Sequence, residues 1–583
     1  MTRRLAASVL LVLAVLPLGS AAAAEQPASR RAVVVVLDDA SMEDLLAVPG
    51  FAALAAAGGG GLLSNTVPLR DAVALLSASG VPMQGLEVVD EGSVASTEGG
   101  ASPEALLRVA ERLQQELERS DAGEVLVVLA SSSPSGAYEG TGDPLGGIVV
   151  AQGAPGDLSA AMRERAAAEA AGTVTSDSTR REGVVTSLDV PETVVGFLGA
   201  LVSDDSGGEV IRTISGPPPF DLHERYLAQR RMYVPIGIAA GLYVTLVGLA
   251  AIGLLALRRR APAWMLEAVS ALTLSVSALV VGLIAAGHLP TLSYGTVVPF
   301  LVVVTGGAAV AVALLARQEP LRPAPWIGAG VLAFFGVEAL LGWTAALTPF
   351  LGGSQLDGGR FYGLPNVLIG LLVGAPLYLG YRRRTAVGVA LLVGTALFAG
   401  LPSVGANLGA SVTLFATAGL WLALRERERL GVWKGVGVVA GITVLGAAAI
   451  LVAHRLSPVP THVTRFEEAA GGLAGVWQTF TDRLLVGWQL IERNPFALIP
   501  ALGLVVVAGV ILRPPPSIRD GFEGRPAWRD AMLAIALGGI VAYVANDSGA
   551  AACGQAFAMS LSGTLFIAIR VALAARTGKM EGP

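Results

Sequence analysis

The stretch "YVPIGIAAGLYVTLVGLAAIGLLALRRRAP" (residues 233–262) joins a long apolar run directly to three consecutive arginines. An apolar run of about 20 residues is long enough to cross the hydrocarbon core of a bilayer as a helix. Lys and Arg residues beside such a run favour the cytoplasmic side of the membrane. The stretch therefore predicts a membrane-spanning helix whose C-terminal end faces inward.

The rest of the C-terminal region repeats this pattern. The 583-residue chain is 53% hydrophobic and 15% charged, with a mean hydropathy of +0.64, which is typical of a multi-pass membrane protein. Within residues 232–583 we expect an all-α membrane domain of about eleven spanning helices, at 233–257, 264–287, 295–316, 325–347, 362–381, 385–401, 405–424, 432–455, 495–512, 528–545 and 551–575.

Loop charges predict the orientation of these helices. The loops that face inward if the N-terminal region lies outside are rich in Arg, whereas the outer loops "GHLPTLSYG" (287–295) and "GLPSVGANLG" (400–409) carry no Lys or Arg. This asymmetry predicts a bacterial plasma-membrane protein with its C-terminus in the cytoplasm.

The first residues, 1–24, combine Arg3 and Arg4 with an apolar core and small residues, which predicts a signal peptide cleaved near Ala24. An uncleaved anchor helix is the alternative, and it also places the following residues outside.

Residues 25–214 have the character of a soluble α/β domain. The stretch 31–41 predicts a buried strand followed by a turn, and 124–133 and 146–153 predict two further buried strands. Helices are expected at 102–120, with Ser102 as the cap, and at 187–201. Buried strands that alternate with helices favour a mainly parallel sheet. We expect the Pro-rich residues 215–231 to be a linker into the membrane, and residues 461–494 to form an amphipathic helix, either on the outer membrane surface or packed on the soluble domain.

Polar residues break the apolar pattern on the outer side of the predicted membrane domain. Gly-rich polar breaks at membrane depth are tolerated where they are buried in protein or line a watery cavity. As a set they predict an outward-facing polar pocket, although each residue taken alone is more simply explained as a helix cap or an interfacial loop. The candidate pocket residues are Asp547, Ser548, Asn546, Arg360, Asp357, Asn366, Asn407 and Glu338. His288 either lines the mouth of this pocket or is an interfacial histidine.

Three segments of the soluble region resemble the alkaline-phosphatase superfamily. They are "AVVVVLDDAS" (32–41), "NTVPLRDAVALLSASGVPMQG" (65–85) and "GVVTSLDVPETVVGFLGA" (183–200), in the order that the superfamily has them. The resemblance implies an alkaline-phosphatase-like fold, with Asp38 or Asp39 at a metal position and Thr66 near the nucleophile position.

The soluble region departs from that superfamily at the residues that carry its chemistry. Residues 25–219 contain neither His nor Cys, and Gln84 stands where the superfamily has a histidine. Because a two-metal site needs several Asp and His ligands, we predict a non-catalytic outer domain without a metal or other cofactor. The whole arrangement resembles a group of bacterial envelope proteins and, more distantly, phosphoethanolamine transferases.

These observations favour one function and leave two alternatives open. We expect the protein to bind or translocate an envelope lipid or lipid-linked precursor through the polar pocket, with membrane lipids and an envelope protein as partners. One alternative is a membrane transferase with Asp547 or Glu338 as the base, and the other is a scaffold without a small-molecule site. The net charge of −5 and the absence of a basic patch in the soluble region disfavour nucleic-acid binding.

Overall fold

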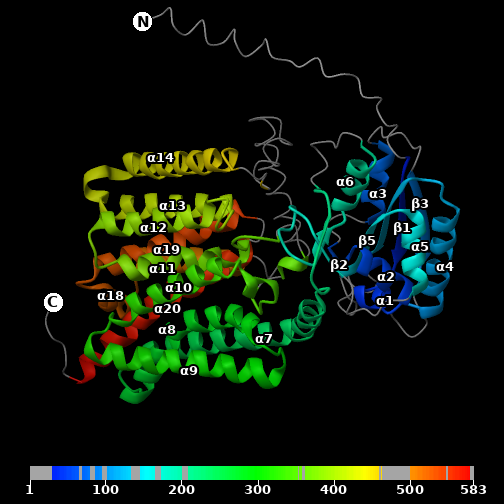
Figure 1. Cartoon of the computed structure of the whole chain (residues 1–583). Helices are drawn as coiled ribbons and strands as arrows, with labels where there is room; N and C mark the ends of the chain where they lie inside the picture. The colour runs from blue at the N-terminus through cyan, green and yellow to red at the C-terminus, as the bar shows by residue number, and fades with distance from the viewer. Residues whose placement is uncertain are drawn as a thin grey trace, which may run out of the picture.

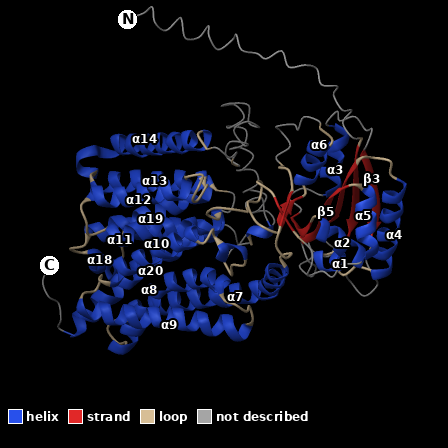
Figure 2. Ribbon diagram, viewed as in Figure 1, coloured by secondary structure: helices blue, strands red, loops and turns tan. Residues whose placement is uncertain are grey.

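The structure, a computed structural model, consists of an α/β domain followed by a helical part. Figures 1 and 2 show the α/β domain at one end of the helical part, whose long helices run side by side. The structure describes residues 29–64, 69–78, 86–94, 101–132, 145–164, 172–199, 208–351, 354–357, 361–457, 461, 499–546 and 549–577. The predicted signal peptide and all but Thr461 of the predicted amphipathic helix at 461–494 lie outside these residues.

The α/β domain is built around the strand β1 (Arg30–Asp38). Its valines alternate between two faces: Val33 and Val35 join one apolar cluster, and Val34 and Val36 join the other. One face is covered by α1 (Met42–Leu46), α2 (Pro49–Ala57), α4 (Pro103–Arg119) and α5 (Pro155–Glu164), and the other by α3 (Leu69–Ala78) and α6 (Asp189–Phe197). A strand covered on both faces must be apolar at every position, which explains the unbroken valine run.

The described strands form one sheet in the order β3-β1-β4-β5-β2-β6-β8, with β7 also paired to β2. Strand β1 is parallel to both neighbours, but β5 is antiparallel to both β4 and β2, so the sheet is mixed. The expectation of a mainly parallel sheet therefore fails around β5, because a doubly covered strand is apolar whichever way it runs. The strands are β2 (Gly59–Ser64), β3 (Leu86–Ser93), β4 (Glu124–Ser132), β5 (Leu145–Gly153), β6 (Thr173–Thr175), β7 (Val184–Thr186) and β8 (Arg212–Ile214).

Several local predictions are confirmed. The three predicted strands are present as β1, β4 and β5, and α4 begins at its predicted cap, where the Ser102 hydroxyl accepts a hydrogen bond from the Ala105 N–H. The prediction of a linker over 215–231 is wrong for most of that range, because the helix α7 (Phe220–Ala256) already begins at Phe220. Tyr226, in the first turns of α7, is fully buried in the core of the α/β domain. This helix therefore joins the two parts without a flexible connection along its length.

Within the described residues, eight helices are long and apolar enough to cross a membrane. They are α7, α8 (Ala263–Ala285, extended by η3 to His288), α9 (Tyr294–Gln318), α10 (Pro323–Leu340), α13 (Leu408–Arg425), α14 (Arg427–Arg455), α19 (Pro526–Ala545) and α20 (Gly549–Thr577). A ninth span is possible if α17 (Ile499–Leu512) and α18 (Pro516–Phe522), bent by 72°, count as one. The remaining two predicted spans are the shorter helices α11 (Ile369–Gly380), preceded by η6 (Asn366–Leu368), and α12 (Thr385–Gly400).

The short helix α11 lies at the centre of the helical part. Nearly all its residues are buried, and it packs on α20 so closely that a Cβ at Gly370 would lie 2.0 Å from the Ala552 carbonyl oxygen. Small residues permit this backbone approach between helices. Before α11 the chain is not helical at 361–365, and Gln555 of α20 donates a hydrogen bond to the Val367 carbonyl and accepts one from the Leu371 N–H. The broken start of α11 is thus held by a side chain of its neighbour.

Candidate functional site

The segment between α10 and α11 lies between the two parts of the molecule. Three of its apolar side chains, Leu347, Leu356 and Phe361, belong to the same apolar cluster as the core of the α/β domain. The Ser64 hydroxyl at the end of β2 also donates to the Leu356 carbonyl at 3.0 Å. The α/β domain is therefore docked on one end of the helical part, which the loop charges predict to be its outer end and where the sequence predicts a polar pocket.

Glu338 lies in the last turn of α10, where the sequence places the clearest acid within a predicted span. The residue is 1% exposed. One carboxylate oxygen pairs with His288 Nε2, and the other accepts a hydrogen bond from the Ala345 N–H at 3.1 Å. The side chain of His288 is 36% exposed, so it lies at the mouth of this cluster. Glu338 is thus a buried, fully engaged carboxylate.

Arg181 of the α/β domain reaches the same place. Its Nε donates to the Phe361 carbonyl at 2.8 Å, and its Nη2 donates to Gln355 Oε1 at 3.2 Å. Burial lowers the pKa of Arg181 to about 10, while the nearby Glu338 opposes that shift. The guanidinium remains charged at neutral pH. Beside it, the Arg180 guanidinium lies 4.0 Å from the centre of the Tyr362 ring, so two adjacent arginines contact the segment between α10 and α11.

Asn407 and Asn366, both predicted pocket residues, are in direct contact. Asn407 caps α13 by accepting from the Ala410 N–H at 2.9 Å, and its amide donates to Asn366 Oδ1 at 2.9 Å and to the Leu364 carbonyl at 2.8 Å. The side chain of Asn407 is fully buried. The same residue therefore acts as a helix cap and as the tie that holds the non-helical chain before η6.

Asn546, at the end of α19, lies against the start of the same helix, α13. Its amide donates to Thr413 Oγ1 at 3.2 Å and to the Ala542 carbonyl at 3.0 Å. A Cβ at position 409 would lie 2.2 Å from Asn546 Oδ1, so the approach requires Gly409. Asn546 Oδ1 is buried and accepts no hydrogen bond from a described residue. The three asparagines thus gather at one helix N-terminus.

The Arg181–Gln355 pair and the three asparagines are connected through the segment between α10 and α11. Gln355 accepts from Arg181 and donates to the Gly363 carbonyl at 3.0 Å, and the next residue, Leu364, donates its N–H to the Gly405 carbonyl at 2.8 Å. Arg181 is therefore connected through Gln355 to the segment that Asn407 holds, and Glu338 is near enough to act on Arg181 electrostatically. We call Arg181, His288, Glu338, Gln355, Asn366, Asn407 and Asn546 the outer polar layer.

The remaining predicted pocket residues are not placed. Asp547, Ser548 and Arg360 lie outside the described residues, and Asp357 ends the short helix η5 (Gln355–Asp357) with its side chain undescribed. Sequence reasoning missed Arg181 and Gln355. Gln355 stands in the Gly-rich polar stretch "GSQLDGG" (353–359), whose composition could have identified it. Arg181 belongs to the α/β domain, and nothing in the sequence around it indicates a contact with the helical part.

The proposed remnant metal position in the α/β domain is occupied by an intramolecular cation. Asp38 at the end of β1 pairs with Arg70 at 2.8 Å and accepts a hydrogen bond from Ser132, and Arg70 also pairs with Asp90 at 2.8 Å. Asp39 follows with a left-handed backbone, φ 70°. Among the described residues, no three His, Cys, Asp or Glu side chains are grouped so that they could hold a metal ion. Thr66 and Gln84 lie outside the described residues.

Asp189, from the third segment that resembles the superfamily, has structural partners. Its carboxylate is fully buried and accepts hydrogen bonds from the hydroxyls of Ser176 and Ser178 and from the N–H groups of Thr186 and Glu209, at 2.7–2.8 Å. Burial raises the pKa of Asp189, and these hydrogen bonds oppose the shift. The side chain thus fixes the turns around β7 and the start of α6.

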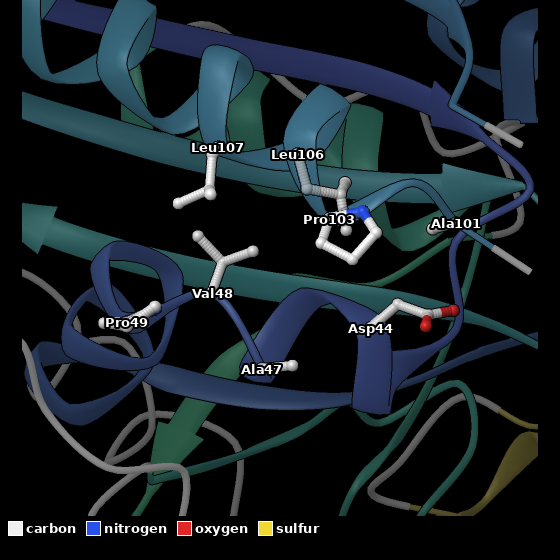
Figure 3. A pocket seen from close by; sticks show the side chains of 8 residues that line it. All are labelled: Asp44, Ala47, Val48, Pro49, Ala101, Pro103, Leu106 and Leu107. Atoms are coloured by element: carbon white, nitrogen blue, oxygen red, sulfur yellow. The ribbon is translucent and has the colours of Figure 1, made fainter. Parts of the chain in front are cut away.

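A pocket of about 140 Å³ lies elsewhere on the α/β domain, between α1–α2 and the start of α4 (Figure 3). Its lining is apolar apart from Asp44, and the Asp44 carboxylate accepts a hydrogen bond from the Ser41 N–H at 3.0 Å as part of the cap of α1. The pocket therefore lacks the convergent polar groups that a small-molecule site needs.

Comparison of the chain with protein-family models, with curated proteins and with solved structures finds no match.

Proposed function

We propose that this multi-pass membrane protein binds a lipid or lipid-linked precursor of the bacterial envelope at the outer polar layer. In this proposal the α/β domain is a non-catalytic, alkaline-phosphatase-like module that governs access to the layer. The observation that carries the proposal is the Arg181 guanidinium, which extends from the α/β domain to Gln355 and Phe361 beside Glu338. Translocation of the same lipid would require the layer to open.

The orientation in the plasma membrane is part of this proposal. The loops at the end remote from the α/β domain carry most arginines of the helical part, which supports a cytoplasmic position for that end and for the C-terminus. The α/β domain then lies outside the cytoplasm, as the predicted signal peptide requires. The outer polar layer would face the outer leaflet, where a lipid head group can reach it.

The chemistry of the layer favours an anionic head group. A guanidinium presents paired N–H donors that match the oxygens of a phosphate. His288 at the mouth supplies a further donor when its ring is protonated. A phosphate that accepts hydrogen bonds from Arg181 would replace the bonds to Phe361 and Gln355, and so would loosen the contact between the α/β domain and the helical part.

Binding of this kind is testable by native mass spectrometry of the full-length protein in mild detergent. We expect the wild type to retain a specific lipid that Arg181→Ala loses and that Arg181→Lys, which keeps the charge without the paired donors, retains in part. Arg119→Ala is the matched control, because Arg119 is an exposed arginine of the same domain. The same lipid pattern in all four proteins would overturn the proposal, provided that their unfolding temperatures agree.

The scaffold alternative has its own support. The Asn407 amide caps α13 and donates to the Leu364 carbonyl and to Asn366, all within the protein, which is a structural role. If Asn366→Ala and Asn546→Ala lower the unfolding temperature but leave lipid retention unchanged, the asparagines are structural and the binding proposal rests on Arg181 alone. The transferase alternative gains no such support from Glu338, whose two oxygens already accept bonds within the protein.

A further inference from the structure

Arg570 is a buried arginine inside the helix α20. The residue is 8% exposed, and its Nη2 donates to the Ala316 carbonyl near the end of α9 at 2.5 Å. Its Nε is enclosed without a hydrogen-bond partner, and its guanidinium forms no ion pair with a carboxylate in the part of the chain that the structure describes. An ionisable side chain within a membrane helix normally faces a partner or a pathway, because its charge is costly in hydrocarbon.

The charges around Arg570 leave a positive excess. Glu267 of α8 and Arg317 of α9 are both near enough to act electrostatically on Arg570. Glu267 is already paired with Arg317, whose Nε lies 2.6 Å from the carboxylate. Two arginines and one glutamate have a formal charge of +1, so this group, which we call the Arg570 cluster, lacks one negative charge among the described residues.

An apolar stripe leads to the cluster along α9. Val303, Val310 and Leu314 are 70%, 60% and 54% exposed, and with Arg317 they recur at helical spacings of seven, four and three residues. Residues with this spacing lie on one face of a helix. In the membrane this face contacts lipid, so an acyl chain can lie along it with its head group at Arg317.

We propose that the Arg570 cluster binds the phosphate of an anionic membrane lipid in the leaflet remote from the α/β domain. The phosphate accepts hydrogen bonds from the guanidinium nitrogens of Arg570 and Arg317 that are not used on Ala316 and Glu267, and it supplies the missing negative charge. An acyl chain lies along Val303, Val310 and Leu314. Basic sites between membrane helices recognise lipid head groups in this way. The site is independent of the outer polar layer.

The test uses full-length protein in a mild non-ionic detergent, with phosphatidylglycerol and phosphatidylethanolamine as probes and native mass spectrometry as the readout. We expect phosphatidylglycerol to be retained preferentially by the wild type. Arg570→Gln and Arg317→Ala should each reduce that retention roughly tenfold, as expected for the loss of a charge-assisted hydrogen bond. Arg519→Ala is the matched control, because Arg519 is an exposed arginine at the same end of the helical part and should leave retention unchanged.

Four results would overturn the proposal. An equal loss in Arg519→Ala would indicate a diffuse effect of charge. Equal retention of both lipids by the wild type, or full retention by both cluster variants, would show no specific site. Inorganic phosphate at millimolar concentration should not displace the lipid, and displacement would show that a free anion is the ligand. If Arg570→Gln does not fold, Arg317→Ala still tests the site, because Arg317 is exposed and its loss leaves the helix packing intact.

Discussion

The two ends of the helical part carry different kinds of polar side chain. At the end that meets the α/β domain, asparagines and a glutamate are buried and hydrogen-bonded to backbone groups and to one another. At the remote end, arginines predominate and pair with fewer acids, as in Arg425 and Arg427, which share Asp530. Both ends are polar, but only the first has its hydrogen bonds nearly complete within the protein.

The difference follows from what the chain does at each end. At the outer end the described residues between α10 and α11 form no α-helix, and the backbone groups freed there need partners that hydrocarbon cannot supply. Asn407 and Glu338 supply such partners. At the remote end the loops reach water and head groups, so surplus charge is tolerated there. Removal of one polar side chain should therefore cost more at the outer end.

The largest effect is expected for Glu338→Ala. The change leaves His288, the Ala345 N–H and the nearby Arg181 without their acidic partner, and loss of one member of a buried pair destabilises a protein by about 3–5 kcal/mol. Chemical unfolding in detergent measures the loss. Glu338→Gln, which keeps an acceptor but not the charge, is the control and should lose less. Stability equal to the wild type in Glu338→Ala would contradict the account of the outer end.

The next effect is expected for Asn407→Ala. The variant loses the cap of α13 and the amide bonds to Leu364 and Asn366, which together contribute about 2–3 kcal/mol. Asn407→Asp keeps the capping acceptor but has no amide donor, so its stability should lie between those of the wild type and Asn407→Ala. If the two variants are equally destabilised, the cap contributes nothing.

A smaller effect is expected at the remote end for Asp530→Ala. Although Asp530 is buried, the side chains of Arg425 and Arg427 are 25% and 52% exposed and can turn to water or head groups. We expect a loss of about 1–2 kcal/mol, less than for Glu338→Ala in the same unfolding measurement. A loss as large as that of Glu338→Ala would remove the distinction between the two ends.

The smallest effect is expected for Arg258→Ala. Arg258, in the turn after α7, pairs with Asp520 of α18 at 3.1 Å, and the two side chains are 29% and 48% exposed. Exposed ion pairs contribute about 0–1 kcal/mol, and their contribution falls as salt increases. Unfolding temperatures measured at low and high salt should therefore differ little between Arg258→Ala and the wild type. A large, salt-independent loss would show that this pair is part of a packed structure.

Several local features were predictable because they depend on neighbouring residues alone. The valine run of β1, the Ser102 cap of α4 and the apolar lengths of the membrane helices follow from burial, capping and hydropathy. Asn366 and Asn407 were both expected on the outer side, but their direct contact comes from the structure alone. The direction of β5 and the helical start of α7 were not predictable, since apolar content does not specify strand direction and Pro-rich residues at 217–219 concealed the helix that follows.

By itself the sequence determined that this chain combines an α/β domain with apolar helices long enough to cross a membrane, because both depend on hydrophobic periodicity and length. It also indicated that polar residues collect at one end of those helices. Only the tertiary structure decided which of them meet. Arg181 reaches Gln355 across 174 positions of the chain, and Arg570 reaches Ala316 across 254. Such contacts depend on how whole elements pack, and no spacing along the chain encodes them.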